Sequence, residues 1–199
     1  MKRGVKKHPA AIGAIRIISG QWRGRKLPVL DAQGLRPTTG RNKETLFNWL
    51  MPYTSNSCCL DVFAGSGGLG FEALSRYAAS VTFIELDKKT AKNLQQNANM
   101  LKVSAQQARI ITGDAAQVLI QLGQPFDIIF LDPPFHRNLL GSTIEQIEHA
   151  QLLKKGGLIY IECEGQGENY EVPDTWHLIK QSQSKQIISR LYQRAYDSA

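Results

Sequence analysis

The sequence predicts an α/β fold in which helices cover both faces of a mostly parallel sheet. Three observations lead to this expectation. From residue 58 onward, short apolar runs alternate with segments of helical pattern, as they do where helical crossovers join parallel strands. The apolar runs are continuous, which is typical of strands buried on both faces. A glycine-rich turn, GSGGLG, follows the first of these runs.

Two short strands and one helix are expected before this alternating region. AIRIISG and RGRKLPVL are predicted to pair as a hairpin whose strands are joined around residues 20–24, because glycines at that spacing favour a turn. The next segment predicts a helix over residues 41–50. Thr38 or Thr39 is suited to cap this helix, and Pro52 would end it.

The alternating region predicts five strands and four helices, and a pair of antiparallel strands follows it. The strands are expected over residues 58–64, 80–86, 108–114, 126–132 and 156–164. The helices are expected from the glycine-rich turn to residue 74 and over residues 87–101, 115–122 and 142–153. WHLIKQ and KQIISRLYQR are interpreted as the final antiparallel pair.

Composition indicates a reduced, cytoplasmic enzyme. The chain has 199 residues, of which 42% are hydrophobic, enough for one sizeable core. No stretch approaches the roughly 20 apolar residues of a membrane span. The first 13 residues lack the apolar segment of a signal peptide, so they are interpreted as a basic tail. Cys58, Cys59 and Cys163 suit neither a disulfide framework nor a zinc site, and no metal is expected.

Positive charge is concentrated in the first quarter of the chain. Residues 1–50 hold eleven Lys and Arg against two acidic residues, whereas residues 51–199 hold thirteen against fifteen. This asymmetry favours a polyanionic partner, most simply nucleic acid. We therefore divide the chain into the tail 1–13, a basic RNA-contacting extension 14–52 and a catalytic domain 53–199. A solvated tail explains the first lysines equally well.

Ligands of parallel α/β sheets bind beyond the carboxyl ends of the strands, and three such ends suggest a nucleoside site. GSGGLG lets a ligand approach the backbone closely, although a turn without a ligand has the same pattern. Glu85 lies 20 residues past Gly65, where an acidic side chain accepts bonds from ribose hydroxyls. Asp114 is suited to bind an adenine amine, to cap the next helix, or to do both. The expected cofactor-binding residues are Asp61, Phe63, Ala64, Gly65, Ser66, Gly67, Gly70, Glu85, Leu86, Asp114 and Ala115.

The segment after the fourth strand distinguishes S-adenosylmethionine from NAD as the cofactor. Asp132-Pro133-Pro134-Phe135 holds a carboxylate, carbonyl groups and an aromatic ring rigidly past a strand end, because proline fixes φ and donates no N–H. Asp132 and the Pro133 carbonyl can accept the two hydrogens of an exocyclic amine and so orient its lone pair for methyl transfer. Phe135 offers a face on which the base can stack. Hydride transfer has no evident use for this arrangement.

These motifs resemble amino methyltransferases of the Rossmann-like, S-adenosylmethionine-dependent class, in which [DN]-P-P-[FYW] follows the fourth strand. The N-terminal segments Arg16 to Gly20, Trp22 to Leu27 and Leu35 to Asn48 narrow the likeness to the RsmD family. That resemblance implies a seven-stranded sheet with an antiparallel last strand. It also implies methylation of a guanine N2 amine in 16S ribosomal RNA, free or in an assembling small subunit.

Carried over to this chain, the resemblance assigns catalysis to Asp132, Pro133, Pro134 and Phe135. A monomer without a membrane partner is expected. The residues expected to contact RNA are Arg23, Arg25, Lys26, Arg36, Thr38, Arg41 and Arg137. Two other functions stay open from the residues alone. One is methylation of DNA adenine or protein glutamine, since the same tetrapeptide serves those amines. The other is RNA binding without catalysis.

Overall fold

The structure, a computed structural model, describes residues 13–29, 40–134, 137–165, 170–184 and 187–196. Within these residues the chain forms nine strands and five helices. The strands are β1 Gly13–Arg16, β2 Lys26–Val29, β3 Cys58–Asp61, β4 Ser80–Glu85, β5 Ala108–Thr112, β6 Phe126–Leu131, β7 Leu153–Glu164, β8 Trp176–Ser184 and β9 Ile187–Arg194. The helices are α1 Gly40–Trp49, α2 Gly70–Ser75, α3 Lys88–Leu101, α4 Ala115–Leu119 and α5 Leu140–His149.

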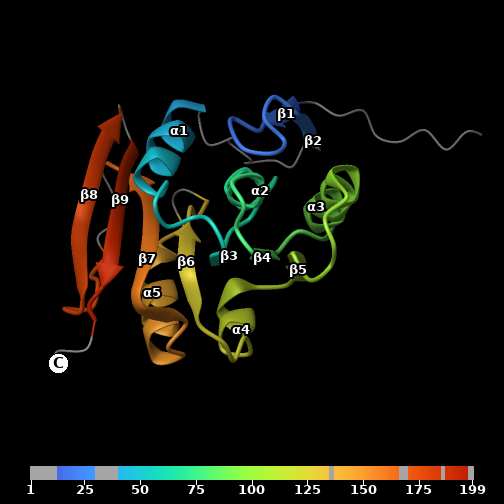
Figure 1. Ribbon diagram of the computed structural model, residues 1–199. Helices are drawn as coiled ribbons and strands as arrows, with labels where there is room; N and C mark the ends of the chain where they lie inside the picture. The colour runs from blue at the N-terminus through green and yellow to red at the C-terminus, as the bar shows by residue number, and fades with distance from the viewer. Residues whose placement is uncertain (1–12, 30–39, 135–136, 166–169, 185–186, 197–199) are drawn as a thin grey trace, which may run out of the picture.

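A seven-stranded sheet forms the centre of the described part of the molecule (Figure 1). Its strand order is β5-β4-β3-β6-β7-β9-β8. The first five strands in this order pair in parallel, and β9 pairs antiparallel with both β7 and β8. Strands β1 and β2 form a separate antiparallel hairpin. The prediction of a mostly parallel, seven-stranded Rossmann-like sheet with a small N-terminal hairpin is therefore confirmed.

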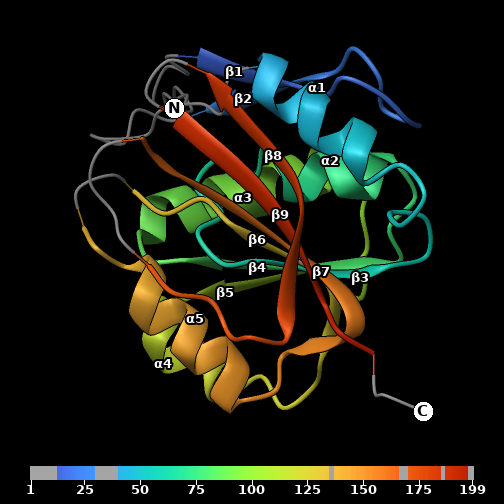
Figure 2. The ribbon, with the colours of Figure 1, turned by 90° about the vertical axis from the view of Figure 1, so that its left-hand side faces the viewer.

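Side-chain alternation along the strands divides the core between the two faces of the sheet. Phe130 of β6 belongs to a buried cluster that also contains residues of α1, α2, α3 and the hairpin. Its neighbours Ile129 and Leu131 belong to the cluster beneath α4 and α5. Successive strand residues point to opposite faces, so the sheet is the middle of three layers, as Figures 1 and 2 show.

The basic N-terminal hairpin shares the main core. Ile15, Ile17 and Leu27 are buried in the same cluster as Phe47 of α1, and Figure 2 shows the hairpin lying over the α1–α3 layer. The turn between β1 and β2 contacts the end of α2 through Gly20, whose φ is +80°. A Cβ added at Gly20 would lie 1.8 Å from the Ser75 carbonyl oxygen, so this close approach requires glycine.

Several element boundaries differ from the sequence-based prediction. Strand β3 ends at Asp61, because the chain turns toward the glycines immediately afterwards. Helix α5 covers residues 140–149 and not 142–153. It ends where Gln151 adopts a φ of +51°. Leu153 then pairs with Phe126 at the start of β7, so an apolar residue that fits the helical pattern is buried by the sheet.

No helix in the ranges given above is both long enough and apolar enough to cross a membrane.

Candidate active site at the carboxyl ends of the parallel strands

The strand order reverses its direction between β3 and β6. Strand β3 lies between β4 and β6 in the sheet, and the chain reaches β4 on one side before it crosses to β6 on the other. Loops that leave two such neighbouring strands run in opposite directions, and ligands of open α/β sheets bind where this happens. Here those loops are the glycine-rich turn and the Asp132 segment.

The glycine-rich turn is held by backbone bonds and by close packing. The Gly67 N–H donates to the Ala64 carbonyl at 2.7 Å, and the Ala64 N–H donates to the Ile84 carbonyl of β4 at 2.9 Å. Gly67 has a φ of +81°, and a Cβ there would lie 2.5 Å from the Phe71 ring. A side chain at this position would push the start of α2 away, so the sequence of the turn fixes its shape. Ser66 and Ala64 are buried and Phe63 is half-buried.

Asp61, at the end of β3, is a carboxylate enclosed by the protein. It is 2% exposed, and its Oδ2 accepts the Gly70 N–H at 3.0 Å. Burial raises the pKa of Asp61 to about 7, the Gly70 hydrogen bond opposes this shift, and the nearby Asp132 and Glu85 carboxylates add to it. The three acidic side chains therefore act on one another electrostatically.

Glu85, expected to bind ribose, holds the glycine-rich turn in this structure. Its Oε2 accepts the Gly65 N–H and its Oε1 accepts the Asp87 N–H, both at 2.8 Å. Burial raises the pKa of Glu85, and these hydrogen bonds oppose the shift. Each carboxylate oxygen has more than one lone pair, so the ribose role stays a prediction that is compatible with this geometry. Leu86 beside it is 67% exposed.

Asp114, expected near adenine, caps α4. Its Oδ1 accepts the Ala116 N–H at 2.9 Å, as an N-cap residue does. Ala115 packs against the cluster beneath α4 and α5. Of the two roles weighed for Asp114, capping is present in the structure, and contact with adenine stays a prediction.

The proline segment follows β6 directly. Asp132 is half-buried, Pro133 is buried and Pro134 is exposed, whereas Phe135 lies outside the described residues. Asp132 is close enough to raise the pKa of Asp61. The structure thus brings together Asp61, Glu85 and Asp132 from three adjacent strands, although 71 residues separate the first from the last along the chain.

A buried polar group next to Asp132 was missed from the sequence. Strands β6 and β7 pair Phe130 with Tyr160, and the Tyr160 hydroxyl donates to Glu162 Oε2 at 2.6 Å. It also lies 3.0 Å from Ser189 Oγ on β9. Burial first, and then Glu162, raises the pKa of Tyr160. The available signal was a glutamate inside the apolar run LIYIEC, since buried acidic residues need partners.

Glu72 was also missed, and it links the N-terminal hairpin to α2. This fully buried side chain accepts the Ile18 N–H at 2.8 Å and the Ser19 N–H at 3.0 Å. Its carboxylate forms ion pairs with Lys43 Nζ at 3.3 Å and Arg76 Nε at 2.9 Å. We call Glu72, Lys43 and Arg76 the buried charge cluster. No motif indicates it, because its members come from different elements.

The basic residues expected to contact RNA do not lie at one place. Arg23, Lys26 and Arg137 are exposed. Arg25 donates through Nη2 to the Met100 carbonyl at 3.0 Å, near the end of α3. Because Glu85 precedes the start of α3, Arg25 lies about 20 Å from that strand end along the helix axis. Arg36 and Thr38 are outside the described residues, as is the side chain of Arg41.

Comparison with known proteins finds close relatives over nearly the whole chain. The model of a family described as Conserved hypothetical protein 95 matches residues 15–193. A Haemophilus influenzae protein named Ribosomal RNA small subunit methyltransferase D is 52% identical over 93% of this chain and 96% of its own length. The Escherichia coli K12 protein of the same name is 50% identical over 95% of this chain and 94% of its own length.

Solved structures resemble the fold equally well. A structure from Escherichia coli superposes with a TM-score of 0.85 at 49% identity and covers 92% of this chain and 99% of its own. A structure from Haemophilus influenzae superposes with a TM-score of 0.80 at 49% identity over the same shares of the two chains.

Proposed function

The chain belongs to the RsmD family, whose model is the one described as Conserved hypothetical protein 95, and we propose that it methylates small-subunit ribosomal RNA. The identity of 50–52% to relatives named Ribosomal RNA small subunit methyltransferase D, over more than nine-tenths of the chain, carries this proposal. In its specific form, the methyl group passes from S-adenosylmethionine to the N2 amine of a guanine in 16S ribosomal RNA.

The chemistry of the strand ends fits S-adenosylmethionine. When bound, this cofactor supplies a methyl group carried on a positively charged sulfur. Asp61, Glu85 and Asp132 form a region of negative charge in which burial and mutual repulsion raise the pKa of Asp61 to about 7. A cation relieves such repulsion. Glu85 together with the N–H groups of the glycine-rich turn provides donors and acceptors suited to a ribose and its substituents.

The role proposed for Asp132 is to orient the amine. A half-buried carboxylate just past β6 and the Pro133 carbonyl each accept one hydrogen of the exocyclic amine, which leaves the nitrogen lone pair directed at the methyl group. The prolines keep both acceptors rigid, so little reorganisation is needed in the transition state. As the N–C bond forms, the bond from the methyl carbon to the sulfur would break and leave its electron pair on the sulfur, and the amine would lose one proton to Asp132 or to water.

The rest of the proposal concerns the whole chain. Residues 14–52 serve as an RNA-contacting extension, residues 53–199 as the methyltransferase domain and residues 1–13 as a basic tail. We expect a cytoplasmic monomer whose substrate is 16S ribosomal RNA, alone or in an assembling small subunit.

Replacing Asp132 tests the assignment. Asp132→Ala should lower the rate of methyl transfer to 16S ribosomal RNA about 10²–10³-fold, the scale seen when one group that stabilises a transition state is removed. Binding of S-adenosylmethionine, measured by isothermal titration, should change little. Asp132→Asn is the matched variant, because asparagine keeps an acceptor oxygen and occurs in the motif, and it should retain more activity than alanine.

The choice of substrate separates the main proposal from its alternatives. Free 16S ribosomal RNA, partially assembled small subunits, duplex DNA and glutamine peptides are supplied in parallel with radiolabelled methyl donor. Label in a guanine of the RNA, alone or in particles, is the expected result. Transfer only to DNA or peptide, or unimpaired turnover by Asp132→Ala, would contradict the proposal.

A further inference from the structure

Helix α3 exposes a basic surface that the sequence-based RNA assignments did not include. Lys88, Lys89 and Lys92 are all exposed on this helix, and α3 contains no acidic residue. The other exposed residues of the helix are Gln95, Gln96, Asn99 and Met100. We call Lys88, Lys89 and Lys92 the lysine face of α3. The nearest acidic residue, Asp87, caps the helix by accepting bonds from the Thr90 N–H and hydroxyl.

The position of two of these lysines is unfavourable for the helix itself. Lys88 and Lys89 occupy its first turn, where no acidic residue is present. The positive end of the helix dipole lies there and disfavours cations. Lys102 lies at the C-terminal end of α3, where the helix dipole makes a cation favourable. The Asp87 carboxylate attracts Lys89, but one carboxylate does not balance three lysines, and residues that break a local preference are expected to serve function.

The lysine face continues into the N-terminal hairpin. The Asn97 side-chain amide donates to the Pro28 carbonyl of β2 at 3.2 Å, and Arg25 donates to Met100, so the hairpin lies along α3. A recess lined by Arg16, Ile18, Arg23 and Gly24 is found in the hairpin. Helical rise places Met100 about 18 Å from Lys88. Basic residues therefore extend from the Glu85 strand end to the hairpin turn.

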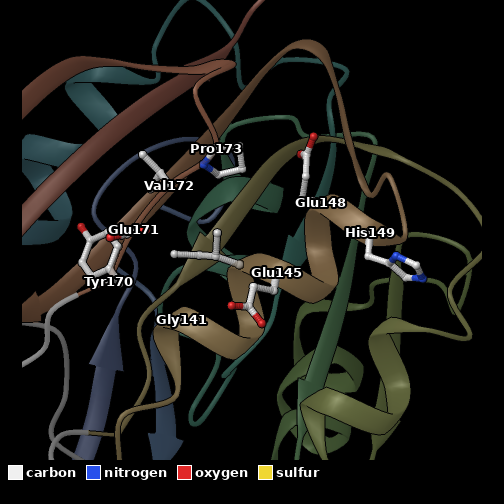
Figure 3. A pocket seen from close by; sticks show the side chains of 9 residues that line it. Gly141, Glu145, Glu148, His149, Tyr170, Glu171, Val172 and Pro173 are labelled. Atoms are coloured by element: carbon white, nitrogen blue, oxygen red, sulfur yellow. The ribbon is translucent and has the colours of Figure 1, made fainter.

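A recess on the opposite face of the sheet is lined by acidic residues. A recess between α5 and the segment before β8 is lined by Glu145, Glu148 and Glu171, together with His149 and Tyr170 (Figure 3). Glu148 is partly neutralised by Arg194 at 3.1 Å, whereas Glu145 is exposed. The glutamates of this recess disfavour phosphate, whereas the lysine face of α3 attracts it.

We propose that the lysine face of α3 and the hairpin turn form a track that binds the phosphate backbone of the RNA substrate and leads it to the carboxyl ends of β3 and β6. This inference rests on the proposed function. It adds the surface and the direction of approach, with RNA crossing the α3 layer and leaving the α5 face free. A track of about 18 Å is long enough to follow several successive phosphates of an RNA strand.

Salt dependence of RNA binding tests the track. The variant K88Q/K89Q/K92Q removes three charges while it preserves helix propensity, since Lys and Gln differ little in that respect. Each phosphate contact contributes about 0.7–0.9 to the slope of log K against log salt. We expect the slope for a 16S ribosomal RNA fragment to decrease by about 2 in the triple variant. The methyl-transfer rate at saturating RNA and the affinity for S-adenosylmethionine should stay unchanged.

Two matched single variants control for a general effect of removing positive charge. Lys92→Gln and Lys180→Gln each remove one exposed lysine, but Lys180 lies on β8 at the far edge of the sheet. Only Lys92→Gln should lower the slope. If the triple variant keeps the wild-type slope while wild type still methylates the RNA, the track is wrong and the proposed function stands. If wild type neither binds nor methylates ribosomal RNA or small-subunit particles, both proposals fail.

Discussion

Two buried carboxylates next to the glycine-rich turn have opposite surroundings. Glu72 is paired with Lys43 and Arg76 and accepts two backbone N–H groups. Asp61, eleven residues earlier, accepts the Gly70 N–H and lies near two further carboxylates that raise its pKa. A buried ion needs compensation. Glu72 receives it from the protein, which suits a structural role, whereas Asp61 belongs to a region whose repulsion a positively charged ligand would relieve.

The largest expected effect comes from breaking the buried charge cluster. Glu72→Ala leaves two backbone N–H groups without their acceptor and Lys43 without its charge partner, although Lys43 keeps its bond to the Arg16 carbonyl at 2.7 Å. Lys43 is 5% exposed, and burial lowers its pKa while Glu72 opposes that shift. Removing one partner of a buried ion pair costs about 3–5 kcal/mol of unfolding free energy. Urea denaturation measures this loss.

A double variant shows whether the loss comes from the unpaired charge. The double variant Glu72→Gln/Lys43→Met should be more stable than Glu72→Gln alone, because a buried pair replaced by uncharged groups costs less than a pair broken on one side. A loss below about 1 kcal/mol for Glu72→Ala would mean that Glu72 is not what attaches the hairpin.

The next loss of stability is expected at the contact between the hairpin and α2, where substitutions of two glycines can be compared. The φ of Gly20 is +80° and that of Gly24 is +84°. Only a Cβ added at Gly20 would contact Ser75. Gly24→Ala should therefore cost about 1 kcal/mol from backbone strain alone. Gly20→Ala should cost about 2–3 kcal/mol or more, because the hairpin must also move. Equal losses in thermal or urea unfolding would contradict this contact.

The last effect concerns the pH dependence caused by Asp61. Its folded-state pKa of about 7 lies above the ordinary value of 3.8, so between these values the folded state binds more protons than the unfolded state. Stability from this group is therefore present at low pH and is lost as pH rises through 7. Wild type should lose about 2 kcal/mol relative to Asp61→Asn between pH 5 and pH 7. Parallel pH profiles of the two proteins would refute this.

Ligand binding provides a second measurement of the same group. A cation bound near Asp61 lowers its pKa. Because a group with a pKa of about 7 is half protonated at pH 7, S-adenosylmethionine should release up to about half a proton on binding at that pH. Titration calorimetry in two buffers of different ionisation heat detects this release. Asp61→Asn should abolish the difference between buffers. Identical heats for wild type in both buffers would mean that Asp61 does not respond to the cofactor.

Much of the fold could be predicted because it depends on neighbouring residues. The continuous apolar run before Asp132 and the two prolines after it fix the end of β6, and Asp87 marks the start of α3 as its cap. The predicted end of α5 was wrong because Leu153 fits a helical pattern as well as a strand pattern. Only pairing with Phe126 decides between them.

The sequence by itself determined the order of strands and helices and the residues that stand at the strand ends, since periodicity and turn residues act over a few positions. Tertiary structure alone decided which charges meet. It placed Lys43 beside Glu72, Asp132 beside Asp61, and Arg25 at the far end of α3. These contacts join residues 29 to 75 positions apart, and their strength depends on burial that only the packed layers create.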